Sequence, residues 1–154
     1  MTSIECLVND HNLTGEMPTW CPRTNLLWWI DVRKPAMYSW DPVTRERKIY
    51  ALPADQVVGS FAIREKGGML LALKDGFYSF DPATGALKLL YHPETDQPEN
   101  RLNDGKCDRR GRYWVGSMFD PRREPKGSFY RFDPDYKCTK LFDDIVIPNA
   151  VAFS

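Results

Sequence analysis

The sequence has few of the residues on which most hydrolases depend. Only two histidines, His11 and His92, occur among its 154 residues, and both lie in polar stretches away from any candidate nucleophile. No G-x-S-x-G motif is present, which argues against a serine hydrolase whose nucleophile sits on a strained turn. The four cysteines contain no C-x-x-C pair, which argues against a zinc site and against a disulfide framework.

Targeting signals and an excess of charge are also missing. The first residues contain neither a basic nor an apolar stretch, so no signal peptide is expected. No apolar run approaches the roughly 20 residues of a membrane-spanning helix, so no membrane contact is expected. The 21 basic and 21 acidic residues balance, so no nucleic-acid partner is expected. Together with the sparse cysteines, these absences predict a cytoplasmic protein with reduced thiols.

Aromatic residues are abundant, and they recur in a repeated signature. Their share of 13%, with 12 prolines, favours short strands joined by tight turns over long helices. Three segments share the order Tyr-x-aromatic-Asp-Pro: Tyr38–Pro42, Tyr78–Pro82 and Tyr130–Pro134. The alternation predicts a strand in each segment. The Asp-Pro pair predicts the turn that ends it, because Asp can accept turn N–H bonds and Pro presets φ.

Each signature is followed by one apolar stretch and preceded by two, so each repeat predicts four short antiparallel strands within roughly 40–50 residues. This period is typical of a propeller blade. We therefore predict an all-β fold, a β-propeller of four-stranded antiparallel blades, with about three blades in a single domain over residues 1–154. The innermost strands are expected to end at Cys21, Ile63 and Cys107, which predicts that both cysteines are small buried residues. The polar segment 119–126 predicts either a variable surface loop or a lid at one mouth of the propeller.

Polar residues recur where the innermost strands begin. Reading back from the strand ends gives Glu16, Gly59 and Asn103. A fourth inner strand over residues 149–154 would place Asn149 in the register of Asn103. Because inner strands line the central channel of a propeller, these side chains are expected to meet at one mouth. Carboxylate and amide oxygens are suited to a hard divalent cation, so the sequence predicts a cation site there.

Five segments together resemble one family. In chain order they read GEMPTW (15–20), LWWID (27–31), RLNDGK (101–106), GRYWVGSM (111–118) and PNA (148–150). Their order and spacing are similar to those of the regucalcin/gluconolactonase/luciferin-regenerating-enzyme-like family, the senescence marker protein family. The resemblance runs essentially from end to end and corresponds to the N-terminal half of the family's fold. It implies a six-bladed propeller with a divalent cation at the channel mouth, which hydrolyses sugar lactones.

The resemblance also assigns roles to individual residues. Glu16 and Asn149 occupy the positions of the family's metal-binding Glu in Gly-Glu-Gly-Pro and Asn in Pro-Asn-Gly. Arg101, Asn103 and Asp120 occupy substrate-binding positions, with Asp120 in the lid loop. One divalent cation is implied; calcium is the first expectation, and zinc, magnesium and manganese are alternatives. No catalytic residue is assigned, because the family's third metal ligand, an Asp and candidate general base, is expected beyond the end of this sequence.

Two positions depart from the family's motifs. Met17 replaces the Gly that follows the metal-binding Glu, and Ala150 replaces the Gly that follows the metal-binding Asn. A Gly at such positions can allow a positive φ or a close approach to a ligand. If the backbone is strained, each replacement costs about 1 kcal/mol or more.

The sequence leaves three interpretations open. The first is the N-terminal half of a divalent-metal-dependent lactonase, with a small sugar lactone as its partner. The second is a non-catalytic calcium-binding protein of the regucalcin kind. The third is a half-propeller that assembles with a partner or with itself, because three blades leave two uncovered sheet faces.

Overall fold

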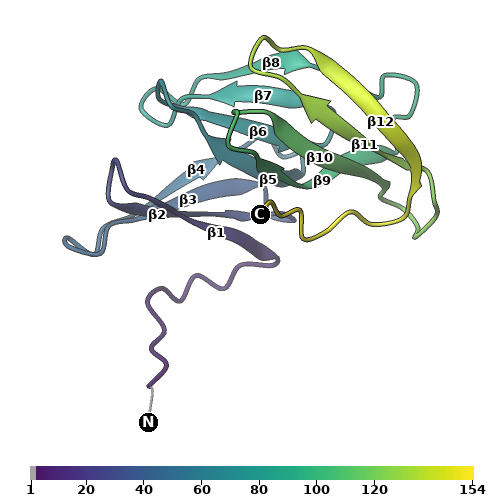
Figure 1. Ribbon diagram of the computed structural model, residues 1–154. Coiled ribbons are helices and arrows are strands. Elements are labelled where there is room, and N and C mark those ends of the chain that lie inside the picture. The colour runs from purple at the N-terminus through teal and green to yellow at the C-terminus, as the bar shows by residue number, and fades with distance from the viewer. Residues whose placement is uncertain (1–2) are drawn as a thin grey trace.

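The structure, a computed structural model, describes residues 3–154. These residues form three four-stranded antiparallel sheets, each with its strands in chain order, and contain no helix (Figure 1). Accordingly, the described part of the chain has no helix that is long and apolar enough to cross a membrane. The sheets follow one another as three blades, which confirms the predicted all-β propeller arrangement.

The strand boundaries follow the repeats closely. Blade one comprises β1 (Gly15–Cys21), β2 (Leu26–Asp31), β3 (Ala36–Trp40) and β4 (Arg47–Ala51). Blade two comprises β5 (Val58–Ile63), β6 (Met69–Leu73), β7 (Phe77–Phe80) and β8 (Leu87–Tyr91). Blade three comprises β9 (Asn100–Cys107), β10 (Tyr113–Phe119), β11 (Gly127–Phe132) and β12 (Cys138–Ile145). The three inner strands β1, β5 and β9 end at the predicted residues.

The Asp-Pro turns act as their chemistry predicts in two of the three blades. Asp41 and Asp81 each accept the backbone N–H of the residue two positions further on, at 2.8 and 2.9 Å. These bonds satisfy donors that the strand ladder leaves free. Asp133 instead forms an ion pair with Arg131 at 2.9 Å. In the third turn it is Asp135 that accepts a backbone N–H, from the residue two positions further on at 3.2 Å.

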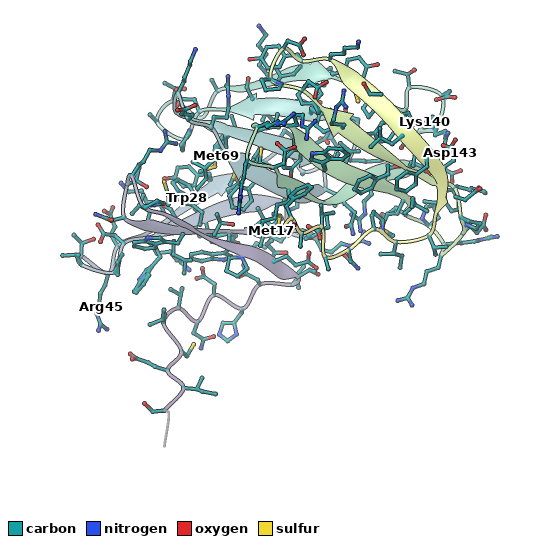
Figure 2. The ribbon with its side chains drawn as sticks, viewed as in Figure 1. Met17, Trp28, Arg45, Met69, Lys140 and Asp143 are labelled. Carbon is teal, nitrogen blue, oxygen red and sulfur yellow. The ribbon has the colours of Figure 1, made fainter. Side chains whose placement is uncertain are left out.

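The core lies between the blades. One cluster joins blades one and two; its fully buried members are Ile30, Met37, Val58, Leu71 and Leu73. Figure 2 shows Trp28 and Met69 of this cluster in the body of the molecule, and Arg45 at the far end of the β3–β4 turn. A second cluster joins blades two and three, where the rings of Phe77 and Phe132 stack with centroids 4.2 Å apart. Burying a large apolar side chain completely contributes about 1.5–3 kcal/mol to the stability of the fold, so the stacked blades stabilise one another.

The two outward faces of the stack carry exposed apolar side chains. Trp20 and Ile49 of blade one are 48% and 52% exposed, and Phe142 of blade three is 53% exposed. No further sheet covers either face within residues 3–154. Uncovered faces of this kind are what a three-blade arrangement predicts, because each blade of a propeller normally packs against two neighbours.

The two inner-strand cysteines are not equivalent. Cys21 is buried against blade two, as expected, whereas Cys107 is exposed. The turn after Cys107 has the same length as the one between Ile63 and Met69. Its end of β9 borders an open pocket that it shares with Trp20 and Ile63, and no further side chain of residues 3–154 covers it there. The prediction of a buried Cys107 is therefore wrong.

The C-terminal segment also differs from expectation. The pattern predicts a fourth inner strand over residues 149–154, but the chain there is irregular and pairs with no strand of the described part. It lies against blade three instead, because Pro148 fills the space beside Gly116, where a Cβ would approach the proline ring to 2.3 Å. The loop expected over residues 119–126 is present, except that Phe119 is the last residue of β10.

Candidate functional site

Four of the five predicted site residues form one hydrogen-bonded network beside β9. Arg101 donates from Nε to Oδ1 of Asp120 at 2.6 Å and from Nη1 to Oδ1 of Asn103, also at 2.6 Å. Asn103 donates in turn to the Pro148 carbonyl at 2.8 Å and to Oδ1 of Asn149 at 3.2 Å. The fold therefore brings the start of β9, the loop after β10 and the C-terminal segment together, as the resemblance implies.

Arg101 is the buried charge of this network. It is 6% exposed, and a guanidinium removed from water to this degree requires a paired carboxylate and further acceptors. Asp120 supplies the carboxylate. Burial raises the pKa of Asp120, but hydrogen bonds from Arg33 and Arg101 outweigh it and hold that pKa below its usual range. Asp120 therefore stays ionised at neutral pH.

Arg33 is a member of the site that the sequence reasoning missed. It lies in the β2–β3 turn of blade one, and its Nη1 and Nη2 atoms each donate to one carboxylate oxygen of Asp120 at 3.0 Å. This two-pronged pair joins blade one to the loop after β10 in blade three. One feature of the sequence could have indicated this role. Arg33 closely follows the LWWID segment, and so lies at the end of a strand that points to the same mouth of the propeller.

Asp31 holds the turn that carries Arg33. Its side chain is fully buried and accepts the backbone N–H groups of Leu13, Thr14, Arg33 and Lys34 at 2.8–3.2 Å. Burial raises the pKa of Asp31, but these four hydrogen bonds outweigh it and lower the pKa. The Asp31 carboxylate thus fixes both the segment before β1 and the β2–β3 turn, so the backbone that carries Arg33 is held in place.

The position of Asn103 depends on a glycine in the neighbouring blade. A Cβ on Gly59 would lie 2.3 Å from the Leu102 carbonyl oxygen and 2.7 Å from the Asn103 Cα, so β5 and β9 touch backbone to backbone at this point. Ser60 adds a hydrogen bond of 2.6 Å to the Asn103 carbonyl. The absent side chain at Gly59, which the sequence reasoning placed in the register of Asn103, therefore allows the close approach that holds the site.

Glu16, the fifth predicted site residue, stands apart from this network. It is exposed near the start of β1 and makes no hydrogen bond or ion pair with the other four residues in the part of the chain that the structure describes. Within residues 3–154 no group of three His, Cys, Asp or Glu side chains is close enough to hold a metal ion. Of the predicted cation ligands, Glu16 and Asn149, only Asn149 is joined to the network of Arg101, Asn103 and Asp120 in the described residues.

Both departures from the family's glycines occupy strained backbone. Met17 has φ of 56° and Ala150 has φ of 61°, in the left-handed region that glycine occupies without penalty. Met17 offsets part of this strain because its side chain packs against the core cluster between blades one and two (Figure 2). Ala150 is exposed and has no such packing to compensate.

Replacing Ala150 with glycine is therefore expected to stabilise the protein by about 1 kcal/mol, because a non-glycine residue in the left-handed region costs roughly this amount. The free energy of unfolding in urea measures it. Ala51→Gly is the matched control, since Ala51 is exposed on β4 in ordinary extended backbone; it should destabilise by about 0.5–1 kcal/mol. Equal destabilisation by both substitutions would show that Ala150 is not strained.

Comparison with known proteins identifies the family of this chain. The family model described as the SMP-30/Gluconolactonase/LRE-like region matches residues 14–154. Among curated relatives, 6-deoxy-6-sulfogluconolactonase of Pseudomonas putida is 30% identical over 99% of this chain and 52% of its own length. Regucalcin of Xenopus laevis is 31% identical over 98% of this chain and 52% of its own length. The chain thus spans about half the length of the curated relatives it matches.

Solved structures agree with the fold. The calcium-binding protein regucalcin of Agrobacterium tumefaciens superposes with a TM-score of 0.88 at 34% identity, covering 96% of this chain and 49% of its own. A gluconolactonase of Xanthomonas campestris superposes with a TM-score of 0.71 at 20% identity, covering 87% of this chain and 48% of its own. The second match, at its lower identity, bears on the fold alone.

Proposed function

The chain belongs to the SMP-30/gluconolactonase/LRE-like family, and on that premise we propose that the protein hydrolyses sugar lactones with the help of one divalent cation. The observation that carries the proposal is the buried network of Arg101, Asn103 and Asp120. Hydrogen bonds fix the donors and acceptors of this network, and we expect the hydroxyl groups of a sugar ring to bind them. Fixed polar groups of this kind orient a substrate without further ordering when it binds.

Glu16 and Asn149 are the residues that would hold the cation. Their donor set, one carboxylate and one amide oxygen, fits a hard cation in its chemistry, and calcium, magnesium and manganese all take such ligands. When bound, such a cation would supply Lewis acidity, polarising the lactone carbonyl and stabilising the negative charge that develops on its oxygen. Arg101 and Asn103 then orient the sugar, and Asp120 keeps the Arg101 guanidinium in place. No residue of this chain is assigned as the general base.

The proposal is tested by acid release from D-glucono-1,5-lactone at constant pH, with the protein in the longest form that its gene encodes. With saturating calcium, we expect a rate clearly above spontaneous hydrolysis, and we expect a chelator to abolish the difference. A rate equal to spontaneous hydrolysis with each of calcium, magnesium, manganese and zinc would overturn the proposal.

Glu16→Gln is expected to weaken cation binding by about tenfold or more, because it removes the negative charge from the ligand set while keeping its shape. Titration calorimetry with calcium measures the affinity. Glu46→Gln is the matched control, since Glu46 is exposed in the β3–β4 turn of the same blade. Unchanged affinity in Glu16→Gln would refute the assignment of this ligand.

A second candidate function is calcium binding without catalysis. It is favoured by the likeness to structures of regucalcin, one of which is described as a calcium-binding protein. Calcium affinity without any lactone hydrolysis would favour this function. The mass of the protein in solution addresses the separate question of assembly: a monomer would exclude pairing of two chains through the uncovered faces of blades one and three.

A further inference from the structure

The charges beside β9 do not balance. Arg33 and Arg101 both pair with Asp120, at 3.0 and 2.6 Å. Within residues 3–154, Asp120 is the only carboxylate within ion-pair distance of either guanidinium. Two positive charges therefore share one negative charge, and one of them, on Arg101, is largely buried. Buried charge is costly unless it is fully compensated, so this cluster favours a second anion.

Hydrogen-bond donors remain free at the same place. Arg101 uses Nε and Nη1, while its Nη2 has no partner in the described part of the chain. Arg33 uses one bond from each terminal nitrogen, and its side chain is 48% exposed. Since a guanidinium carries five N–H donors, several donors of the pair are left over beside Asp120. Forked donors of this geometry match the paired oxygens of a carboxylate, phosphate or sulfonate.

The other acidic groups near the mouth do not neutralise this cluster. Glu16 makes no ion pair with a residue of the described chain, and Asp104 accepts the backbone N–H of Val151 at 3.2 Å. The buried carboxylate of Asp31, which accepts the backbone N–H groups of Arg33 and Lys34, is offset by the exposed side chain of Lys34. The positive surplus therefore remains on the side of the site formed by the β2–β3 turn and the loop after β10.

From this juxtaposition we propose that Arg33, together with Arg101, recognises an anionic substituent on the sugar lactone, so that the site prefers acidic sugar lactones to neutral ones. The inference rests on the proposed lactone site and deepens it. Asp120 keeps the donors that it already binds, and the substituent takes up those that Asp120 leaves free, Nη2 of Arg101 among them. Arg33 is then a specificity-determining residue contributed by blade one to a site built mainly on blade three.

The test uses two lactones that differ only at C6: D-glucaro-1,4-lactone, which carries a carboxylate there, and D-glucono-1,4-lactone, which carries a hydroxymethyl group. We expect the wild-type protein to favour the acidic lactone in kcat/KM. Arg33→Ala should lower that preference about tenfold, the effect of losing one charge-assisted hydrogen-bond pair. The preference of Arg33→Lys should lie between those of the wild type and Arg33→Ala, because lysine keeps the charge but cannot donate two parallel hydrogen bonds.

Lys34→Ala is the matched control, since it removes the adjacent exposed charge and leaves the Asp120 pair intact. Its preference should stay within about twofold of the wild type. If Arg33→Ala slows the hydrolysis of both lactones equally, Arg33 only connects blades one and three, and the inference is wrong. If the wild type hydrolyses neither lactone, the proposed function fails, and calorimetric binding of the two lactones to wild type and Arg33→Ala then decides the preference independently.

Discussion

Arg101→Ala is expected to reduce lactone hydrolysis by about 100-fold or more, the effect of removing a preorganised polar group that contacts the reacting molecule. The substitution removes the donor that Asp120 and Asn103 share, at 2.6 Å to each. It also leaves the Asp120 carboxylate with Arg33 alone, while the bond from Asn100 of β9 to the Lys126 carbonyl still holds the loop after β10. The kcat/KM for D-glucono-1,5-lactone measures the loss.

Two further variants separate the site from general effects of charge and folding. Arg131→Ala removes an arginine that pairs with Asp133 in the third Asp-Pro turn, away from the network, and should leave the rate within about twofold. Arg101→Lys keeps the buried charge but loses the fork, so the protein should fold while hydrolysis still falls by at least about tenfold. A rate near wild type in Arg101→Lys would show that the guanidinium does not orient the sugar.

Gly59→Ala is expected to destabilise the protein by about 3 kcal/mol, at the upper end of the cost of overpacking a well-packed site. The added Cβ would meet the Leu102 carbonyl oxygen at 2.3 Å, and both partners are strand backbone that cannot rotate away. Relief requires β5 and β9 to separate, which moves Asn103. The free energy of unfolding in urea measures the loss, and weaker calcium binding should accompany it.

Gly85→Ala is the matched control for this substitution. Gly85 lies in the β7–β8 turn with φ of 74°, and a Cβ added there would meet no atom within 4 Å, so only the strained backbone counts against alanine. Its cost should be about 1 kcal/mol. If the two substitutions destabilise the protein equally, the close contact of β5 and β9 is not what holds the site.

The blades could be predicted from the sequence because their signals are local. The Tyr-x-aromatic-Asp-Pro repeats mark the third strand of every blade, and Asp41 and Asp81 close their turns by bonds to residues two positions away. Patterns of this kind depend on neighbours along the chain. The inner-strand ends at Cys21, Ile63 and Cys107 followed from the same spacing.

Contacts between blades could not be predicted in the same way. Arg33 and Asp120 are 87 residues apart, and the residues of the turn around Arg33 do not indicate a partner in blade three. The exposure of Cys107 depends on an open pocket that it shares with Trp20 of blade one and Ile63 of blade two, and the repeat pattern of one blade carries no signal for such a pocket. The resemblance to a family pointed to Arg101, Asn103, Asp120 and Asn149, and the structure joins them, whereas the place of Glu16 beside them is still a prediction.

The central claim is that one cation and one lactone meet at the same site. The most direct measurement is the rate of D-glucono-1,5-lactone hydrolysis as a function of calcium concentration, for the wild-type protein and for Glu16→Gln. We predict that hydrolysis requires calcium and that Glu16→Gln shifts the half-saturating calcium concentration upward by about tenfold. Hydrolysis that is independent of every divalent cation, or a calcium dependence that Glu16→Gln leaves unchanged, would contradict the account.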